Sequence, residues 1–437
     1  MTWLKTGFAF FCWGSVVVAG AAVALGATPS SVSAVNPSAA ALGAHTSESE
    51  PAAKGAPVNS AVERGKYLTN AGNCVSCHTR PGRVPFSGGL PFKTPFGTIY
   101  STNITPDNET GIGKWTAADL RRAMQEGIAA GGYPLFPAFP YTSFTKVSDQ
   151  DVNAIYAYLR TVKAQHYEPP RNGILFSQRW VMKLWNALYF EPARYAPDRS
   201  KSAQWNAGAY LVQGLGHCSA CHTPRNPMMA EVSSLRFTGG LLLEKVAENK
   251  IRLWSGVNLT SASSGLARWS IADLIKYLST GFSLRAGAFG PMNDVIVNST
   301  AHLAAQDVQA MAVYLKSLPA LDALDSTVTS QQAKAGEDIY KQRCEKCHMS
   351  SGRGGLFNGP PLAGSAVVQA DSPASLINII LYGPEVPKQV SFGAWESMKP
   401  YIDVLTDAEI ASVSNYVRGS WDNRAAPVTV ADVAAQR

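Results

Sequence analysis

The sequence is short of the features that mark several common protein classes. Charged residues make up only 16% of the 437 residues, and the formal net charge of +7 is spread along the chain without a concentrated basic run. Dispersed charge of this kind argues against nucleic-acid binding. No nucleophile–base triad, phosphate-binding loop or pair of carboxylates stands out. We therefore expect no active site for an organic substrate in this chain.

Long hydrophobic runs are absent beyond the N-terminus. Lys5 precedes an uncharged run from Gly7 to Ala27, which small residues follow. This pattern is typical of a secretory signal peptide, and the run is also just long enough to cross a bilayer. We expect residues 1–34 to be either a cleaved signal or a retained membrane anchor. In both cases the rest of the chain is exported.

Cysteine is scarce, and its distribution is the strongest signal in the sequence. Six of the seven cysteines lie in three copies of the pattern Cys-x-x-Cys-His, which leaves no pair for a disulfide. The copies contain Cys74, Cys77 and His78; Cys218, Cys221 and His222; and Cys344, Cys347 and His348. The pattern predicts covalent attachment of haem c, with the thiols on the two vinyl groups and the histidine as an axial ligand of the iron.

Two other interpretations explain the motifs less well. A zinc site built from cysteine pairs does not need a histidine directly after every second cysteine. A redox dithiol does not need three copies in a chain without a βαβ pattern. The three motifs therefore predict three haems c as the cofactors.

Each motif is preceded by a predicted helix that carries a glycine and a tyrosine, and each repeat closes with a second predicted helix. The glycines are Gly65, Gly208 and Gly336. Glycine costs a helix about 1 kcal/mol relative to alanine. Its predicted use is a close approach of the two helices, since glycine has no side chain to hold them apart.

The closing helices carry their own start signals. Ser148-x-x-Asp151 and Thr406-x-x-Glu409 predict capping boxes in the first and third repeats. Ala304 stands at the corresponding position of the middle repeat, which therefore lacks a capping side chain.

The repeats predict an all-α fold of three tandem domains, each of which resembles the small cytochrome c domain. The expected parts are a signal or anchor (1–34), a flexible linker (35–60), domain 1 (61–165), an aromatic and proline-rich strut (166–200), domain 2 (201–319), a linker (320–330), domain 3 (331–425) and a tail (426–437). Two interpretations of the strut remain. Either it packs on both neighbouring domains, or it presents a hydrophobic patch to a partner subunit or the membrane surface.

An electron-transfer haem usually has both axial positions filled, and methionine opposite histidine raises the reduction potential. Met292 and Met398 lie between the motif and the closing helix of their repeats, in predicted loops with a proline nearby. We predict that they are the sixth ligands of the second and third haems.

The first repeat departs from this pattern. The slot that corresponds to Met292 holds Phe139, and phenylalanine cannot ligate iron. Met124 and Met182 are the candidates from elsewhere in the chain, and His166 is a weaker one. An open coordination position on the first haem is the remaining alternative.

The three motifs behind an export signal resemble the trihaem cytochrome c subunits of bacterial membrane-bound alcohol, aldehyde and gluconate dehydrogenases. The resemblance is carried by Asn73–Thr79, Cys218–Arg225 and Asn415–Trp421, and it covers roughly residues 60–425. Many members of these families have methionine where Phe139 stands. This departure weakens the assignment of the chain to the alcohol and gluconate branches. It favours a molybdenum-type aldehyde dehydrogenase as the partner.

The resemblance implies an electron-transfer subunit that is not an enzyme by itself. On the periplasmic side of the bacterial inner membrane, such a subunit accepts electrons from a catalytic dehydrogenase subunit and passes them through its haems to ubiquinone. Two alternatives remain. A haem enzyme such as a cytochrome c peroxidase would turn over peroxide as the isolated protein, and a multihaem subunit of a terminal oxidase would copurify with an oxygen-reducing core.

Overall fold

The computed structural model describes residues 58–174, 180–247, 250–322, 330–387, 390, 393 and 395–437. The expected signal or anchor and most of the following linker lie outside these residues. The described residues belong to one compact unit, Gly55–Arg437. None of the helices in these ranges has the length and apolar character needed to cross a membrane.

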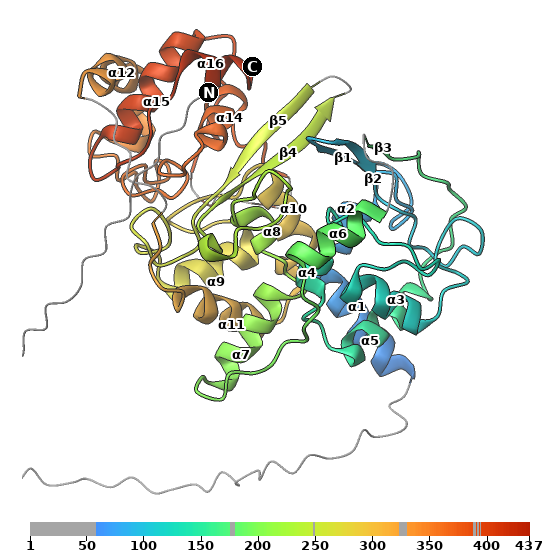
Figure 1. Ribbon diagram of the computed structural model, residues 1–437. Coiled ribbons are helices and arrows are strands. Elements are labelled where there is room, and N and C mark those ends of the chain that lie inside the picture. The colour runs from blue at the N-terminus through green and yellow to red at the C-terminus, as the bar shows by residue number, and fades with distance from the viewer. Residues whose placement is uncertain are drawn as a thin grey trace, which may run out of the picture. The chain divides into compact units, whose positions relative to one another are not determined.

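The elements follow the chain as three groups (Figure 1). The first repeat contains α1 (Val58–Ala71), α2 (Cys74–His78), β1 (Pro91–Thr94), β2 (Gly97–Tyr100), α3 (Ala117–Glu126), α4 (Tyr141–Phe144) and α5 (Asp149–Leu159). The strut contributes β3 (Gly173–Ile174) and α6 (Trp180–Tyr189). The second repeat contains α7 (Ala203–Gln213), α8 (Ser219–His222), η1 (Ser233–Leu235), β4 (Gly240–Ala247), β5 (Lys250–Gly256), α9 (Ile271–Thr280), α10 (Pro291–Asn298), η2 (Thr300–His302) and α11 (Ala305–Lys316). The third contains α12 (Ser330–Arg343), α13 (Glu345–His348), α14 (Ala374–Tyr382), α15 (Asp407–Gly419) and α16 (Val430–Ala434).

One helix pair recurs in all three repeats. Helix α1 packs against α5, α7 against α11, and α12 against α15. A Cβ atom added to the predicted crossing glycines would lie 1.9 Å (Gly65 to Ala154), 1.9 Å (Gly208 to Ala310) and 2.0 Å (Gly336 to Ser412) from a backbone carbonyl oxygen of the opposite helix. No side chain fits in such a gap, so the predicted close approach of the helices is confirmed.

The helix starts agree with the sequence in part. Helix α15 begins with the predicted capping box of Thr406 and Glu409. Ser148 caps α5 by accepting a hydrogen bond from the backbone N–H of Asp151, but the Asp151 carboxylate does not return to Ser148. The capping box predicted for α5 is therefore wrong in its second half. Arg64 and Tyr210 bind that carboxylate instead, through contacts that reach it from elsewhere in the chain.

The all-α expectation holds only in part, because the described residues are rich in helix but also form five strands. Strands β1, β2 and β3 form an antiparallel sheet in that order, and β4 and β5 form a hairpin with Leu242 opposite Trp254. These strands are short, so their alternation is hard to distinguish from part of a buried helix in the sequence. Tertiary contacts decide whether such a segment becomes a strand or part of a helix.

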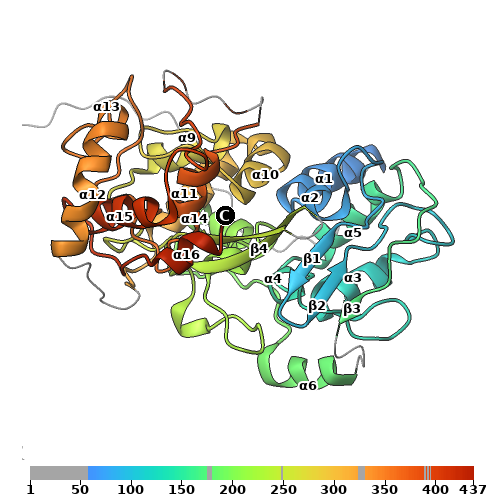
Figure 2. The same cartoon turned by 90° about the horizontal axis from the view of Figure 1, so that it is seen from above.

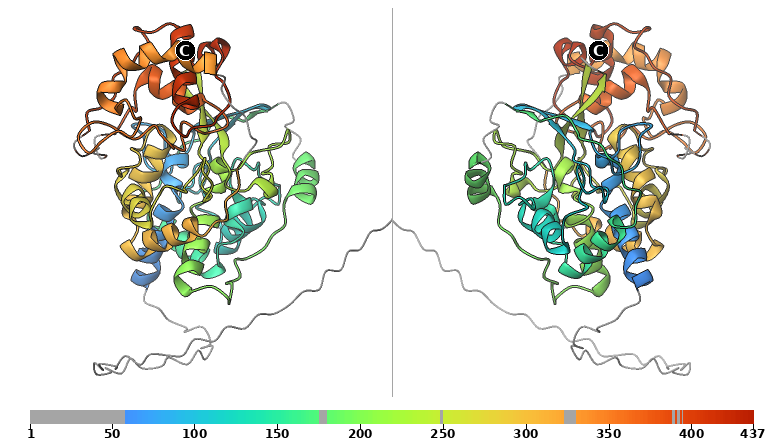
Figure 3. Two further views of the ribbon diagram at one scale, coloured as in Figure 1. Left: turned by 90° about the vertical axis from the view of Figure 1, so that its left-hand side faces the viewer. Right: turned by 90° about the vertical axis from the view of Figure 1, so that its right-hand side faces the viewer.

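The first two repeats share one hydrophobic core, which contains Leu68 and Ile155 from the first and Val212 and Met311 from the second. Figure 3 shows α1 beside the yellow and orange helices of the second repeat from two sides. The third repeat has a separate core around Tyr340.

Two equivalent contacts, which we call the tyrosine clasp, join the first two repeats. The Tyr67 hydroxyl donates to the Asp307 carboxylate, and the Tyr210 hydroxyl donates to the Asp151 carboxylate at 2.7 Å. Each hydroxyl also accepts a hydrogen bond from the backbone N–H at the cap position of the helix that it meets, at 3.1 Å for Tyr67 and 3.0 Å for Tyr210. Burial raises the pKa of both tyrosines to about 12; the hydrogen bond to the aspartate adds to the rise and the hydrogen bond from the backbone N–H opposes it, so both remain protonated donors.

The third repeat packs on the hairpin of the second (Figure 2). Ser255 of β5 and Ser375 of α14 exchange hydrogen bonds, with N···Oγ distances of 2.9 and 3.2 Å. The Asn378 amide donates to the Leu253 carbonyl at 2.8 Å. The hairpin therefore links the second and third repeats.

Helix α6 of the strut contacts both neighbouring repeats. The Tyr141 hydroxyl donates to Asn186 at 2.6 Å, and the Trp185 indole donates to the Met228 carbonyl at 2.9 Å. The opposite face is apolar and exposed, with Trp180 62% and Leu188 64% accessible. Figure 2 shows this helix at the edge of the ribbon. The strut thus packs on both domains and also presents an apolar face to its surroundings.

Candidate haem-attachment sites

Each Cys-x-x-Cys-His motif forms a short helix, with its first cysteine inside the helix in the first motif and at the N-cap in the other two. Residues three positions apart in a helix lie on the same face. The three helices are α2, α8 and α13, and each directly follows the first helix of its repeat. The six cysteines of the motifs are all half-buried and free of disulfides. The structure therefore places three equivalent pairs of thiols at three equivalent positions.

The motif histidines all have one ring nitrogen occupied by a backbone carbonyl. The Nδ1–O distances are 2.7 Å for His78 to Thr102, 2.7 Å for His222 to Val257 and 2.9 Å for His348 to Pro360. Burial lowers the pKa of all three imidazoles, which favours the neutral form that ligates metals. An Nδ1–H that donates to a carbonyl fixes the tautomer and leaves Nε2 for an iron.

The thiols lie in surroundings that disfavour thiolates. Burial, with a further contribution from the second thiol of the motif, raises the pKa of Cys74 and Cys218 to about 12 and that of Cys344 to about 11. A zinc site requires thiolates. Nor do the described ranges contain a cluster of three or more His, Cys, Asp or Glu side chains that suits a metal ion. The uncharged thiols in these surroundings are compatible with thioether bonds to haem.

The second site opens into a cavity. Cys218, Cys221 and His222 line it, as does Met292 of α10. Most of the other lining side chains are apolar, among them Trp254 of the hairpin. A largely apolar cavity that is lined by a histidine and a methionine suits a haem. Met292 lies in the first turn of α10 rather than in a loop, and its role as a ligand stays a prediction.

The third site brings its predicted ligands to one core. Cys344 and Met398 are both partly buried and pack against the cluster that contains Tyr340. His348 is buried, with 9% of its surface accessible. Met398 lies outside the regular helices, as expected from the sequence.

The first site separates the two candidate methionines. Met124 is 4% exposed in α3 and belongs to the core against which Cys74 and Phe139 pack. Met182 packs in a different cluster, with Trp185 of α6, and Phe139 packs against that cluster as well. The third candidate, His166, has a side chain that is 64% exposed and lies 3.6 Å from the Asp107 carboxylate.

The sequence did not indicate that the first two sites share a wall. Ala71 and Asn73, which precede the first motif, line the cavity of the second site. The Asn298 amide donates to Ser76 at 2.9 Å, and the Cys77 pKa is raised to about 11 by burial and then by Cys221. Contacts between residues more than a hundred positions apart leave no local signal in a single sequence.

Comparisons with known proteins extend these observations. A family model described as "Cytochrome c" matches residues 62–163, and one described as "Cytochrome C oxidase, cbb3-type, subunit III" matches residues 331–417. The chain is 39% identical to the gluconate 2-dehydrogenase cytochrome c subunit of Pantoea cypripedii over 86% of this chain and 89% of that protein. It is 38% identical to the cytochrome c subunit of alcohol dehydrogenase (quinone) of Gluconobacter oxydans over 84% of this chain and 80% of that protein.

The chain belongs to the family of cytochrome c subunits of quinone-dependent dehydrogenase complexes. It is an electron-transfer subunit with covalently bound haem c, not the catalytic subunit of such a complex. It is also 42% identical to a nicotinate dehydrogenase subunit of Pseudomonas putida, over 82% of this chain but only 30% of that protein. The cytochrome c subunit thus spans about a third of that longer relative.

Proposed function

We propose that this cytochrome c subunit carries three haems c and passes electrons from a catalytic dehydrogenase subunit to ubiquinone. The observation that carries the proposal is the threefold recurrence of one arrangement. In each repeat a glycine-crossed helix pair frames a Cys-x-x-Cys-His motif whose histidine has Nδ1 bound to a backbone carbonyl. The name of the Gluconobacter oxydans relative, which includes "(quinone)", supports a quinone as the acceptor.

The chain's own residues hold and tune the cofactor. Covalently bound haem c supplies one-electron redox chemistry at its iron. The paired thiols anchor each haem, and His78, His222 and His348 ligate the irons through Nε2. Met292 and Met398 complete two of the sites and raise their potentials. For the first haem we propose Met124 or Met182 as the sixth ligand, and the core that Met124 shares with Cys74 supports Met124.

The three domains are proposed at residues 61–165, 201–319 and 331–425. The shared wall between the first two sites supports direct electron transfer between those haems, because residues of the first motif region line the second cavity. The hairpin that packs on α14 brings the third domain against the second. The chain thus holds its sites in fixed proximity.

The proposed location is the periplasmic side of the bacterial inner membrane. The hydrophobic run after Lys5 supports export, and the exposed apolar face of α6 supports contact with the membrane or with a partner subunit. For the catalytic partner we propose an aldehyde dehydrogenase first, on the basis of Phe139, and an alcohol or gluconate dehydrogenase next.

Purification of the native complex from membranes tests the proposal. We expect three haems per chain by pyridine haemochrome assay, a copurifying dehydrogenase identified by mass spectrometry, and oxidation of the reduced haems by a ubiquinone analogue. The proposal would be lost if the chain purified alone and turned over peroxide.

The ligand of the first haem needs its own comparison. In a Met124→Leu variant we expect one haem to lose the sulfur–iron absorption, whereas Met182→Leu should leave the spectrum unchanged. The opposite result would assign the ligand to Met182, and no change in either variant would exclude both.

A further inference from the structure

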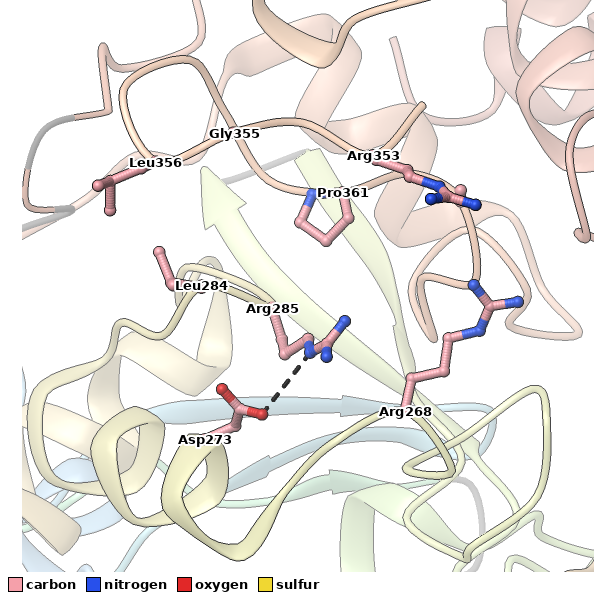
Figure 4. Close-up of a pocket in the computed structure, with 9 residues that line it drawn as sticks. Arg268, Asp273, Leu284, Arg285, Arg353, Gly355, Leu356 and Pro361 are labelled. Carbon is pink, nitrogen blue, oxygen red and sulfur yellow. Dashed lines mark ion pairs between the residues drawn. The ribbon is translucent and has the colours of Figure 1, made fainter. Parts of the chain in front are cut away.

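A second cavity, of about 490 Å³, lies where the second and third repeats meet. Arg268 and Arg285 line it from the second repeat and Arg353 from the third. Figure 4 shows these three side chains around one space, although they come from segments far apart in the sequence. Three guanidinium groups at one cavity form a site for anionic groups.

Nearby carboxylates form ion pairs with two of these guanidinium groups, but they do not use all of the N–H donors. Arg268 donates to Asp422 at 2.9 Å, on the exposed side of the cavity. Arg285 lies 3.6 Å from Asp273, whose same oxygen already accepts hydrogen bonds from Ser270 at the start of α9. Within the described ranges Arg353 forms no ion pair. Each guanidinium has five N–H donors, so donors remain for another anion.

This cavity adjoins the haem slot of the second site. Arg268 and Arg285 line both, as do Pro361 and Ala363 of the third repeat. The negative charges at the periphery of a haem are its two propionates, at the edge opposite the vinyl groups that cysteines bind. The largely apolar cavity that Cys218 and Cys221 line therefore also contains the positive charges of Arg268 and Arg285.

The backbone of the third repeat also leaves room for the Arg268 side chain. Gly364 has a φ of +70°, and a Cβ atom added to it would lie 2.4 Å from the Nε atom of Arg268. Only glycine allows this guanidinium to lie against the backbone there. The docking of the third repeat thus positions an arginine of the second.

We propose that Arg268 and Arg285 bind the propionates of the second haem, and that Arg353 adds a third positive charge across the domain junction. The inference rests on the proposed attachment of that haem at Cys218 and Cys221. Positive charge beside the haem stabilises its reduced, less positive state, so the three arginines raise its reduction potential. The third domain thereby tunes a cofactor that it does not carry.

Redox titration of the full-length holoprotein, followed by absorption, tests the inference. Arg285→Gln and Arg268→Gln should each lower one midpoint by a roughly tenfold change in the reduction equilibrium, which is about 59 mV for one electron. Arg353→Gln should lower the same midpoint by less, because its side chain is exposed. Arg285→Lys should restore part of the loss.

The controls separate this effect from misfolding and from lost ion pairs. Asp422→Asn removes a partner of Arg268 but keeps the cation, so no midpoint should fall. Arg199→Gln removes an exposed arginine that lines neither cavity and should leave all midpoints unchanged. Haem content and far-UV circular dichroism show which variants are folded.

The affected haem is identified by Met292→Ala, which must shift the same midpoint. Unchanged midpoints in folded Arg268→Gln and Arg285→Gln variants, or a shift in a different haem, would overturn the inference and leave electron transfer by the subunit intact. A chain without haem at Cys218 and Cys221 would overturn both.

Discussion

Replacing Gly208 by alanine tests the helix crossing that frames the second haem site. The added Cβ would lie 1.9 Å from the carbonyl oxygen of Ala310 and 2.4 Å from its carbon. Ordinary Cα–H···O contacts have C···O distances of about 3.3 Å. Helices α7 and α11 must therefore separate by about 1.4 Å at a point where only backbone atoms meet.

Two opposing terms set the expected size of the effect. Overpacking of this kind costs about 3 kcal/mol at the upper end of its usual range. The higher helix propensity of alanine stabilises the helix by about 1 kcal/mol relative to glycine. The net loss is about 2 kcal/mol. The first two repeats share one core, and for a cooperative unit of roughly 150–250 residues such a loss lowers the Tm by about 4–8 °C.

The assay is thermal unfolding of the holoprotein followed by circular dichroism, with haem content measured in parallel. Gly173→Ala is the matched control, because no atom lies within 4 Å of the added Cβ and the backbone is outside the left-handed region. We expect the control to stay within about 0.5 kcal/mol of the wild type. Equal Tm values for the two variants would refute the packing argument.

Three further predictions concern the clasp, an axial ligand and the helix caps. Tyr210→Phe leaves the buried Asp151 without one of its donors, so we expect a loss of about 1–2 kcal/mol in urea unfolding, and no loss would show that the clasp is not stabilising. Met292→Ala should lower one haem midpoint and remove one sulfur–iron absorption, whereas an unaltered spectrum would exclude this ligand. Hydrogen bonds from the capping residues, with the backbone N–H as the largest cause, lower the pKa of Asp119 and Glu409 below 3.8 and 4.5. Their stabilisation is complete above those values and is lost as the pH falls through the lowered pKa, so the stability difference between wild type and Asp119→Asn should vanish in acid.

The sequence predicted those parts of the fold that depend on interactions between neighbouring residues. The Cys-x-x-Cys-His motifs and the crossing glycines each depend on a few neighbouring positions, and the structure places Gly65, Gly208 and Gly336 at three equivalent helix crossings. The capping box of Thr406 and Glu409 formed for the same reason. Its counterpart at Ser148 did not form completely, because Tyr210 competes for the carboxylate from another repeat.

The features that the sequence missed are decided by contacts between distant segments. The hairpin of β4 and β5 supplies Leu242 and Trp254 to the second cavity, yet its strands carry only a weak period of two. Tyr67 and Asp307 are separated by 240 positions, so neither residue predicts the other. The arginine cavity forms only once the third repeat has docked on the second.

The tyrosine clasp has the pattern of an isologous dimer interface within one chain. Tyr67 and Tyr210 hold corresponding places in the first two repeats, as do Asp151 and Asp307, and each tyrosine meets the aspartate of the other repeat. A two-fold axis produces this reciprocity in homodimers. Residues near such an axis meet their own counterparts, and Cys221, the counterpart of Cys77, is one of the groups that raise the pKa of the Cys77 thiol. The first two repeats are thus joined as a pair with reciprocal contacts and a shared core, and the third repeat, which has its own core, stands outside that pair.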